Sequence, residues 1–118
     1  MATEQNNTIT EQEREFCHGL LQVIFGGHSL FDDDYAVDYS KELLDTVMQN
    51  LADLPDMERE VLTMIFRDGK TRREIGEKLN IALEEELRGF EAAGLRMMRH
   101  PKRSKKYLPF MTRLQEDA

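Results

Sequence analysis

The stretch from Thr71 to His100 constrains the fold of this chain more than any other part of the sequence. Its apolar residues recur with helical spacing on both sides of a short break, which predicts a short helix from Thr71 to about Lys78 and a longer one from about Leu83 to Arg99. Glu74 follows Thr71 at the spacing of a capping box, which marks the first start. Two such helices joined by a tight turn are typical of a helix-turn-helix.

Three further helical segments are expected before this pair. Thr10 and Glu13 have the spacing of another capping box, at the start of a helix that ends at Gly26–Gly27. Ser40 suits the cap of a helix that runs to about Ala52, and Pro55 suits the start of a helix from Asp56 to about Arg67. The sequence therefore predicts an all-α fold, a compact helical bundle that contains the helix-turn-helix and has an additional N-terminal helix.

Charge is distributed unevenly along the 118 residues. Residues 1–54 carry eleven Asp and Glu against two Lys and Arg, a net charge of -9, whereas residues 55–118 carry twelve against fourteen, a net charge of +2. We divide the chain into a disordered arm (1–9), an acidic N-terminal helix and loop (10–39), a helix-turn-helix domain (40–111) and a tail (112–118). The acidic half is not expected to bind DNA.

Three ordered motifs make the second half of the chain recognisable. They are L-x-x-L-x-x-x-E-x-x-V-L from Leu51 to Leu62, T-x-x-E-I-G-x-x-L from Thr71 to Leu79, and L-R-x-x-R-H-P-x-R-S from Leu95 to Ser104. With them, the segment from Leu51 to Phe110 resembles region 4 of bacterial RNA polymerase sigma factors, their carboxy-terminal helix-turn-helix domain. The resemblance implies docking on the flap of the RNA polymerase core through helices 56–67 and 71–78, and contact with the minus-35 promoter element.

The sequence departs from that family where the second helix enters the major groove. Sigma factors have a segment rich in Thr, Arg and Gln there, but residues 82–89 of this chain read ALEEELRG, with one extra residue in the turn and no Ser or Thr cap at Ala82. Glu84, Glu85 and Glu86 place three consecutive carboxylates toward a polyanion. Because affinity for DNA comes largely from neutralising phosphates, we expect promoter DNA binding to be weak or altered.

Basic side chains of the helix-turn-helix and of the segment after it are candidates for contact with phosphates. Pro101 is expected to stop the long helix, His100 to act as a helix end group, and the basic cluster that follows to be either a solvated tail or part of a phosphate-binding strip. The predicted DNA-binding candidates are Arg72, Arg73, Arg88, Arg96, Arg99, Lys102 and Arg103.

Acidic side chains form a second set of candidates, for a basic protein partner. They are Asp32, Asp33, Asp34, Glu84, Glu85 and Glu86. The aspartates lie in a loop with interleaved aromatic residues, which is either simply solvated or imitates nucleic-acid phosphates and grips a basic surface. The loop does not fit the Gly and Glu positions of a calcium-binding loop, so no metal site is predicted.

Nothing in the sequence points to catalysis. There is no nucleophile-and-base arrangement, no glycine-rich phosphate loop and no metal-ligand spacing, so neither an enzyme nor a cofactor is expected. The single cysteine, Cys17, is interpreted as a core residue on a helix face. The absence of a long apolar run and of a signal-like start indicates a cytoplasmic protein without membrane contact.

Three functional hypotheses remain open at this point. The first is a stand-alone sigma region 4-like transcription factor or regulator that docks on bacterial RNA polymerase. The second is an acidic inhibitor from a phage or mobile element that imitates nucleic acid on a sigma-like scaffold. The third is a small helix-turn-helix DNA-binding regulator. The N-terminal helix either packs on the rest of the chain or forms an interface with a partner or with a second copy in a homodimer.

Overall fold

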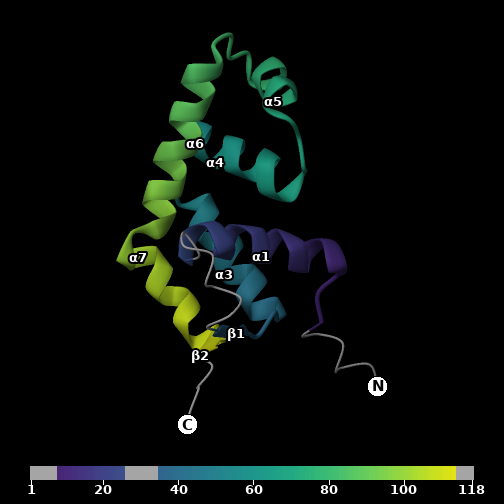
Figure 1. Cartoon of the computed structure of the whole chain (residues 1–118), viewed down its shortest axis with the longest axis vertical. Helices are drawn as coiled ribbons and strands as arrows, with labels where there is room; N and C mark the ends of the chain where they lie inside the picture. Colours follow the sequence, from purple (N-terminus) through teal and green to yellow (C-terminus); the bar gives the residue numbers. More distant parts are fainter. Residues whose placement is uncertain (1–7, 26–34, 114–118) are drawn as a thin grey trace.

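Helices account for most of the fold, which confirms the all-α prediction. The computed structural model describes residues 8–25 and 35–113. In chain order the elements are α1 (Glu11–Phe25), β1 (Tyr35–Val37), α3 (Lys41–Ala52), α4 (Asp56–Leu62), the π-helix η2 (Thr63–Arg67), α5 (Arg72–Leu79), α6 (Glu84–Arg99), α7 (Pro101–Ser104), the 3-10 helix η3 (Lys105–Phe110) and β2 (Met111–Arg113). Helix α6 runs along much of the longest axis of the molecule (Figure 1).

Local capping explains why the helices begin where the sequence predicts. The Thr71 hydroxyl accepts a hydrogen bond from the Glu74 amide at 3.1 Å, and the Glu74 carboxylate accepts one from the Thr71 amide at 2.9 Å. Thr10 and Glu13 form the same reciprocal pair at 3.0 and 2.9 Å. Ser40 accepts from the Leu43 amide at 3.2 Å and caps α3. Each cap satisfies amide groups that lack partners within their helix.

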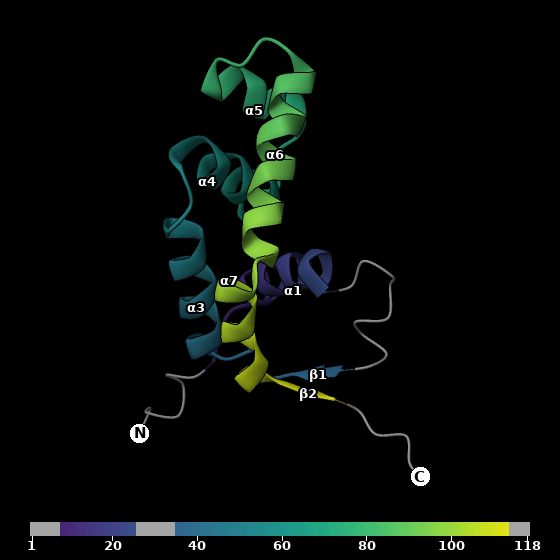
Figure 2. The same ribbon diagram turned by 90° about the vertical axis from the view of Figure 1, so that its left-hand side faces the viewer.

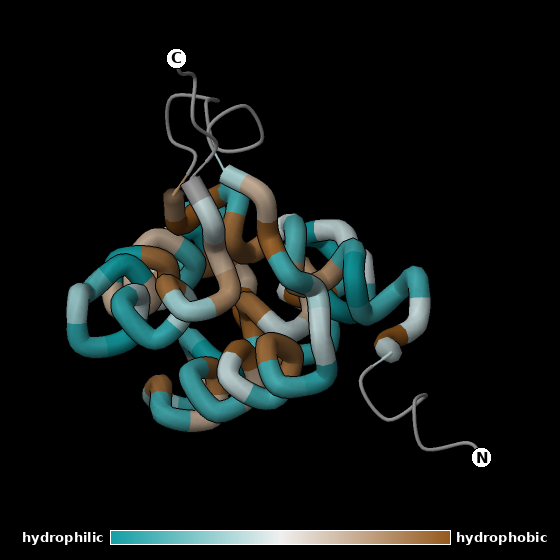
Figure 3. Tube along the Cα trace, turned by 90° about the horizontal axis from the view of Figure 1, so that it is seen from below, coloured by the Kyte–Doolittle hydropathy of each residue, from teal (hydrophilic) through white to brown (hydrophobic). Residues whose placement is uncertain are grey.

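The larger hydrophobic cluster joins α1 to α3 and to the end of α6. The five buried side chains of α1 are all 9% exposed or less, so its apolar face packs on the chain itself. The hydrophobic positions of the trace gather toward the interior of the molecule (Figure 3). The buried members of this cluster are Phe16, Cys17, Leu20, Leu21, Ile24, Leu43, Val47, Leu51, Leu54, Leu62, Met98 and Tyr107.

A smaller hydrophobic cluster lies under the helix-turn-helix. Val61, Met64, Ile75 and Leu87 are its buried members, contributed by α4, η2, α5 and α6. The two clusters meet where α4 passes α6. A Cβ atom on Gly94 would lie 2.9 Å from Cδ1 and 3.2 Å from Cγ of Leu62, so the two helices approach each other closely at this point.

Hydrogen bonds from the buried Asn50 of α3 hold α7 and η3 against that helix. Asn50, 2% exposed, donates from Nδ2 to the Tyr107 hydroxyl at 2.8 Å and to the Arg103 carbonyl at 3.2 Å. Burial raises the pKa of Tyr107 to about 12, so its hydroxyl keeps its proton at neutral pH. Figure 2 shows α7 beside α3, in agreement with these contacts.

A two-stranded antiparallel sheet is present that the sequence analysis did not predict. Tyr35 lies opposite Arg113 and Val37 opposite Met111, and the Asp38 amide extends the pairing by donating to the Phe110 carbonyl at 2.8 Å. The sheet joins residues that we assigned to the N-terminal helix and loop with residues at the start of the assigned tail. Strands of three residues carry too little alternation to be recognised from the sequence.

Two helix ends have features that the sequence did not predict. The helix predicted from Asp56 to Arg67 is continuous, but its last five residues are π-helical, with the Asp68 amide donating to the Thr63 carbonyl at 3.2 Å. The long helix α6 ends at Arg99, before Pro101, as expected, but the chain turns at His100 and a new helix, α7, begins with Pro101 at its first position. The His100 ring accepts from the Lys102 amide at 3.0 Å and caps that new helix.

No helix in residues 8–25 or 35–113 is long and apolar enough to cross a membrane.

The two glycines of α6 offer a matched test of its packing. Gly94→Ala should lower the free energy of unfolding by about 1–3 kcal/mol, because the buried Leu62 side chain has no room to move away from the new methyl group. Gly89→Ala should raise it by up to about 1 kcal/mol, since nothing lies within 4 Å of that position and alanine favours the helix. Urea unfolding followed by circular dichroism measures both, and equal effects would contradict the close contact at Gly94.

Candidate nucleic-acid interface

The helix-turn-helix forms one end of the molecule, at the top of Figure 1. Asn80 ends α5 in the left-handed conformation, with φ 61° and ψ 43°. The chain then turns, and the Ile81 amide donates to the Gly76 carbonyl at 2.8 Å. Ile75 of α5 and Leu87 of α6 are both buried in the smaller cluster, which fixes the two helices relative to each other. We call this end, residues 71–91, the helix-turn-helix tip.

Three carboxylates occupy the first turn of α6. Leu83 is the N-cap residue and its side chain makes no capping hydrogen bond, so the first amides of α6 have no side-chain acceptor from that position. Glu84, Glu85 and Glu86 follow, and all three are exposed. Negative charge at a helix N-terminus is favourable because it opposes the positive end of the helix dipole. The same charges repel a phosphate backbone.

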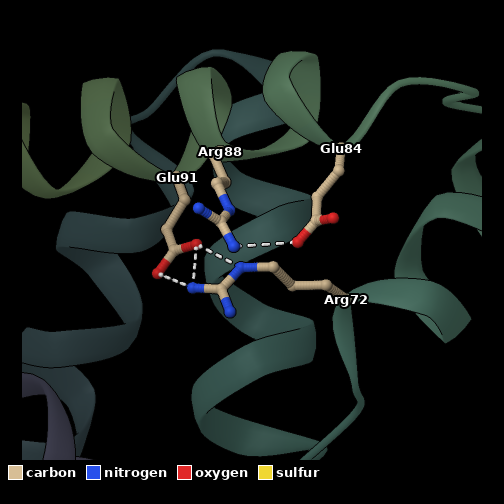
Figure 4. Close-up of polar contacts among 4 residues, drawn as sticks. All are labelled: Arg72, Glu84, Arg88 and Glu91. Carbon is tan, nitrogen blue, oxygen red and sulfur yellow. Dashed lines mark hydrogen bonds and ion pairs between the residues drawn. The ribbon is translucent and has the colours of Figure 1, made fainter.

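The arginines at the tip are paired with carboxylates (Figure 4). Arg72 of α5 reaches across to Glu91 of α6 and donates to it from both Nε (3.2 Å) and Nη2 (3.0 Å). Glu91 is only 18% exposed, which reduces the screening of this pair by solvent. Arg88 donates to Glu84, one helical turn earlier, at 2.9 Å.

Arg73, the third predicted arginine at the tip, is also near a carboxylate. Its Nε lies 3.6 Å from Oε2 of Glu77, and both side chains are largely exposed. Such exposed pairs contribute little to stability. Each of the three predicted DNA-binding arginines at this end therefore has an acidic neighbour, which lowers the positive charge that the tip presents to a ligand.

An open groove of about 550 Å³ runs between α5 and the start of α6. Leu83, 63% exposed, is the most exposed large apolar side chain in the described part of the chain. The groove is lined by Arg72, Arg73, Gly76, Glu77, Asn80, Ile81, Ala82, Leu83, Glu84 and Leu87.

The other four basic candidates lie toward the opposite end of α6. Since α6 has 16 residues, its two ends are about 24 Å apart. Arg96 and Lys102 are exposed, and Arg99 is exposed while donating to the Val23 carbonyl at 3.3 Å. The structure thus divides the seven candidates into two groups instead of bringing them into one strip.

Arg103 has a structural role and does not present a free positive charge to a ligand. Its side chain is 13% exposed and donates to Asp53 of α3 at 2.8 Å and to the Met97 carbonyl at 3.2 Å. It therefore ties α7 to α3 and to the end of α6, and we do not carry it forward as a phosphate ligand.

The acidic candidates are only partly described. Glu84, Glu85 and Glu86 lie on the exposed surface of the tip, whereas Asp32, Asp33 and Asp34 lie outside the described residues. The described ranges contain no cluster of three or more His, Cys, Asp or Glu arranged to hold a metal ion. Cys17 is fully buried, as predicted for a core residue, and burial raises its pKa to about 12, so its thiol stays protonated.

A second surface was missed by the sequence analysis. Two adjoining hollows of about 220 and 600 Å³ share Phe16, Met48 and Arg67, from α1, α3 and η2. Met48 is 40% exposed, on a helix whose other large apolar residues are buried or partly buried. We call these hollows the α1–α3 groove. In the sequence, only an excess of apolar residues on α3 could have indicated this groove, because one of its sides is formed by α1, which is distant in sequence from α3 and η2.

Comparison with known protein families shows a similarity that includes part of the tip. A family model described as Sigma-70, region 4 matches residues 50–85, which run from the last turn of α3 to the first residues of α6. Residues 50–85 are therefore similar to the sigma region 4 helix-turn-helix, and the match supports a role in transcription regulation. The match ends at Glu85, within the three consecutive carboxylates at the start of α6. No solved structure matches this chain.

The missing side-chain hydrogen bond at the N-cap of α6 can be tested by its effect on stability. Leu83→Ser should raise the free energy of unfolding by about 1 kcal/mol, because a serine hydroxyl at an N-cap accepts a hydrogen bond from the first turn. Leu83→Ala removes the same exposed apolar surface without adding an acceptor and should leave stability nearly unchanged. Thermal or urea unfolding measures the difference. If serine and alanine have the same effect, the N-cap is not at Leu83.

Proposed function

We propose, from the sigma region 4 helix-turn-helix at residues 50–85, that this protein is a regulator that docks on bacterial RNA polymerase and has weak or altered contact with promoter DNA. One observation carries the proposal. The α4–α5–α6 framework of a region 4 domain is intact, but α6 begins with Glu84, Glu85 and Glu86 at the place where the family contacts DNA.

The charge of the tip supports the loss of promoter contact. Bringing a carboxylate to a phosphate backbone adds repulsion and provides no cation to release counterions from DNA. Arg72 and Arg88, which remain at the tip, must first leave Glu91 and Glu84 before they can bind phosphates. In the major groove these glutamates can only accept hydrogen bonds, for example from cytosine N4, and they cannot donate to the acceptors of guanine.

The α1–α3 groove is the docking surface that we propose for polymerase. Sigma region 4 domains in general bind the polymerase flap and promoter DNA. The groove combines buried and half-buried apolar side chains with Arg59, Glu60 and Arg67 at its sides, which is the composition of a site for an amphipathic helix. It includes residues of α4 and η2, within the helical segment 56–67 that the family resemblance implicates.

A second candidate function is an acidic inhibitor that imitates nucleic acid. The specific observation in its favour is that the exposed carboxylates of α6 lie together at one end of the molecule, next to an open groove. A nuclease-treated pull-down from bacterial lysate separates the two functions. Recovery of core RNA polymerase supports docking, whereas recovery of another basic, nucleic-acid-handling protein that is released by salt supports the inhibitor.

Neutralising the tip should strengthen its contact with promoter DNA. We expect Glu85→Gln/Glu86→Gln to raise the affinity for a minus-35 duplex several-fold at low salt, because two exposed charges that repel phosphates are removed. The matched control is Glu11→Gln/Glu15→Gln, which neutralises two exposed carboxylates near the start of α1. Fluorescence anisotropy measures both. Equal gains would mean that net charge matters and the position of the carboxylates does not.

Docking can be tested independently of DNA. Met48→Glu places a charge in the α1–α3 groove and should reduce recovery of core RNA polymerase several-fold, with little change in stability because Met48 is 40% exposed. Leu83→Glu makes the same type of change at the tip, where the leucine is 63% exposed, and should leave recovery unchanged. If only the tip variant loses polymerase, the docking surface is at the tip and the proposed groove is incorrect.

A further inference from the structure

Helix α6 and the segment after it have two halves of opposite charge. Residues 84–91 contain four Glu and one Arg, whereas residues 92–112 contain six Lys and Arg and no Asp or Glu. The first half forms the start of α6 at the tip. The second half continues through the end of α6, α7 and η3 to the opposite end of the molecule (Figures 1 and 2).

Five of the six basic residues in this second half are exposed. Arg103 is the exception, because it packs against α3 and pairs with Asp53. We call the other five the basic edge: Arg96, Arg99, Lys102, Lys105 and Lys106. Within the described ranges, no ion pair joins any of them to a carboxylate. Their positive charge is therefore not compensated by a carboxylate of residues 8–25 or 35–113, in contrast to the charge of the tip arginines.

The spacing of the basic edge places its charges in sequence along the surface. Arg96 and Arg99 are three residues apart on α6 and are thus neighbours on its surface. Lys102 and Lys105 continue at the same spacing in α7 and η3. The His100 cap and the Asn50–Tyr107 hydrogen bond hold these short helices in place, so the cations are presented by an ordered backbone.

The composition of the edge favours a phosphate backbone over a lipid surface. Leu108, 53% exposed, is the one large exposed apolar side chain in the described part of this segment. Binding to a membrane surface requires a buried apolar face as well as cations. Binding to the DNA backbone requires only cations and carries no sequence information.

We infer that the basic edge binds the phosphate backbone of duplex DNA without sequence preference, at the end of the molecule away from the helix-turn-helix tip. This goes beyond the proposed function, because it does not use the reading helix and does not depend on polymerase. The acidic tip repels the duplex and the basic edge attracts it, so the two halves of α6 together orient the protein on DNA.

The test is binding of the full chain to a fluorescein-labelled duplex of random sequence between 50 and 200 mM salt. Over this range the logarithm of the affinity falls linearly with the logarithm of the salt concentration, with a slope proportional to the number of phosphate contacts. Lys105→Ala/Lys106→Ala should weaken binding equally for unrelated sequences and reduce the slope of log affinity against log salt by about 2, since each lost phosphate contact removes about 0.9. Arg96→Ala/Lys102→Ala changes the other part of the edge and should act in the same direction.

The matched control is Lys70→Ala/Lys78→Ala, which removes two exposed cations at and next to the tip and should leave the slope unchanged. The inference is overturned if the control reduces affinity as much as the edge variants, or if the unaltered protein does not bind the duplex at 50 mM salt. Vesicles that contain phosphatidylserine form a separate arm. Binding to them as tight as binding to the duplex, and lost in the same variants, would also overturn it.

Discussion

The close approach of α4 to α6 is the contact on which the other packing depends. Gly94 lets α6 lie against Leu62, and these two helices contribute side chains to both hydrophobic clusters. Val61 and Leu87 enter the smaller cluster, while Leu62 and Met98 enter the larger one. The packing of α4 against α6 therefore determines the orientation of the helix-turn-helix tip relative to α1 and α3.

Electrostatics at the start of α6 serve stability and recognition differently. Glu84, Glu85 and Glu86 favour the helix by interacting with its dipole and compensate for a leucine at the N-cap, which supplies no acceptor. In a domain that contacts DNA at this turn, the same residues oppose the ligand. The structural role alone explains why glutamate is tolerated here. Stabilising the start of α6 does not require glutamate at three successive positions. For this reason the functional proposals concern this turn.

The features that the sequence predicted are local in the chain. Capping residues lie three positions from their partners, and apolar faces repeat every three or four, so Thr71, Thr10 and Ser40 marked helix starts correctly. The missed features join distant residues. Arg72 and Glu91 are 19 positions apart, Arg103 and Asp53 are 50 apart, and the β1–β2 pairing spans most of the chain. A list of basic residues therefore overestimated the available charge, because it could not show which arginines are paired.

The packing of α1 shows that the segment matching the family model does not form the hydrophobic core by itself. The segment that matches the family covers residues 50–85, yet the larger cluster depends on five buried side chains of α1 and on Met98 and Tyr107 beyond the match. Leu43, Val47 and Leu62 belong to the same buried cluster as the α1 side chains, so removing α1 would expose apolar surface of this cluster to water. The folded unit thus includes α1 as well as the segment that matches the family model. A graft of residues 50–85 into another protein would carry only the first two residues of α6 and would lack α1.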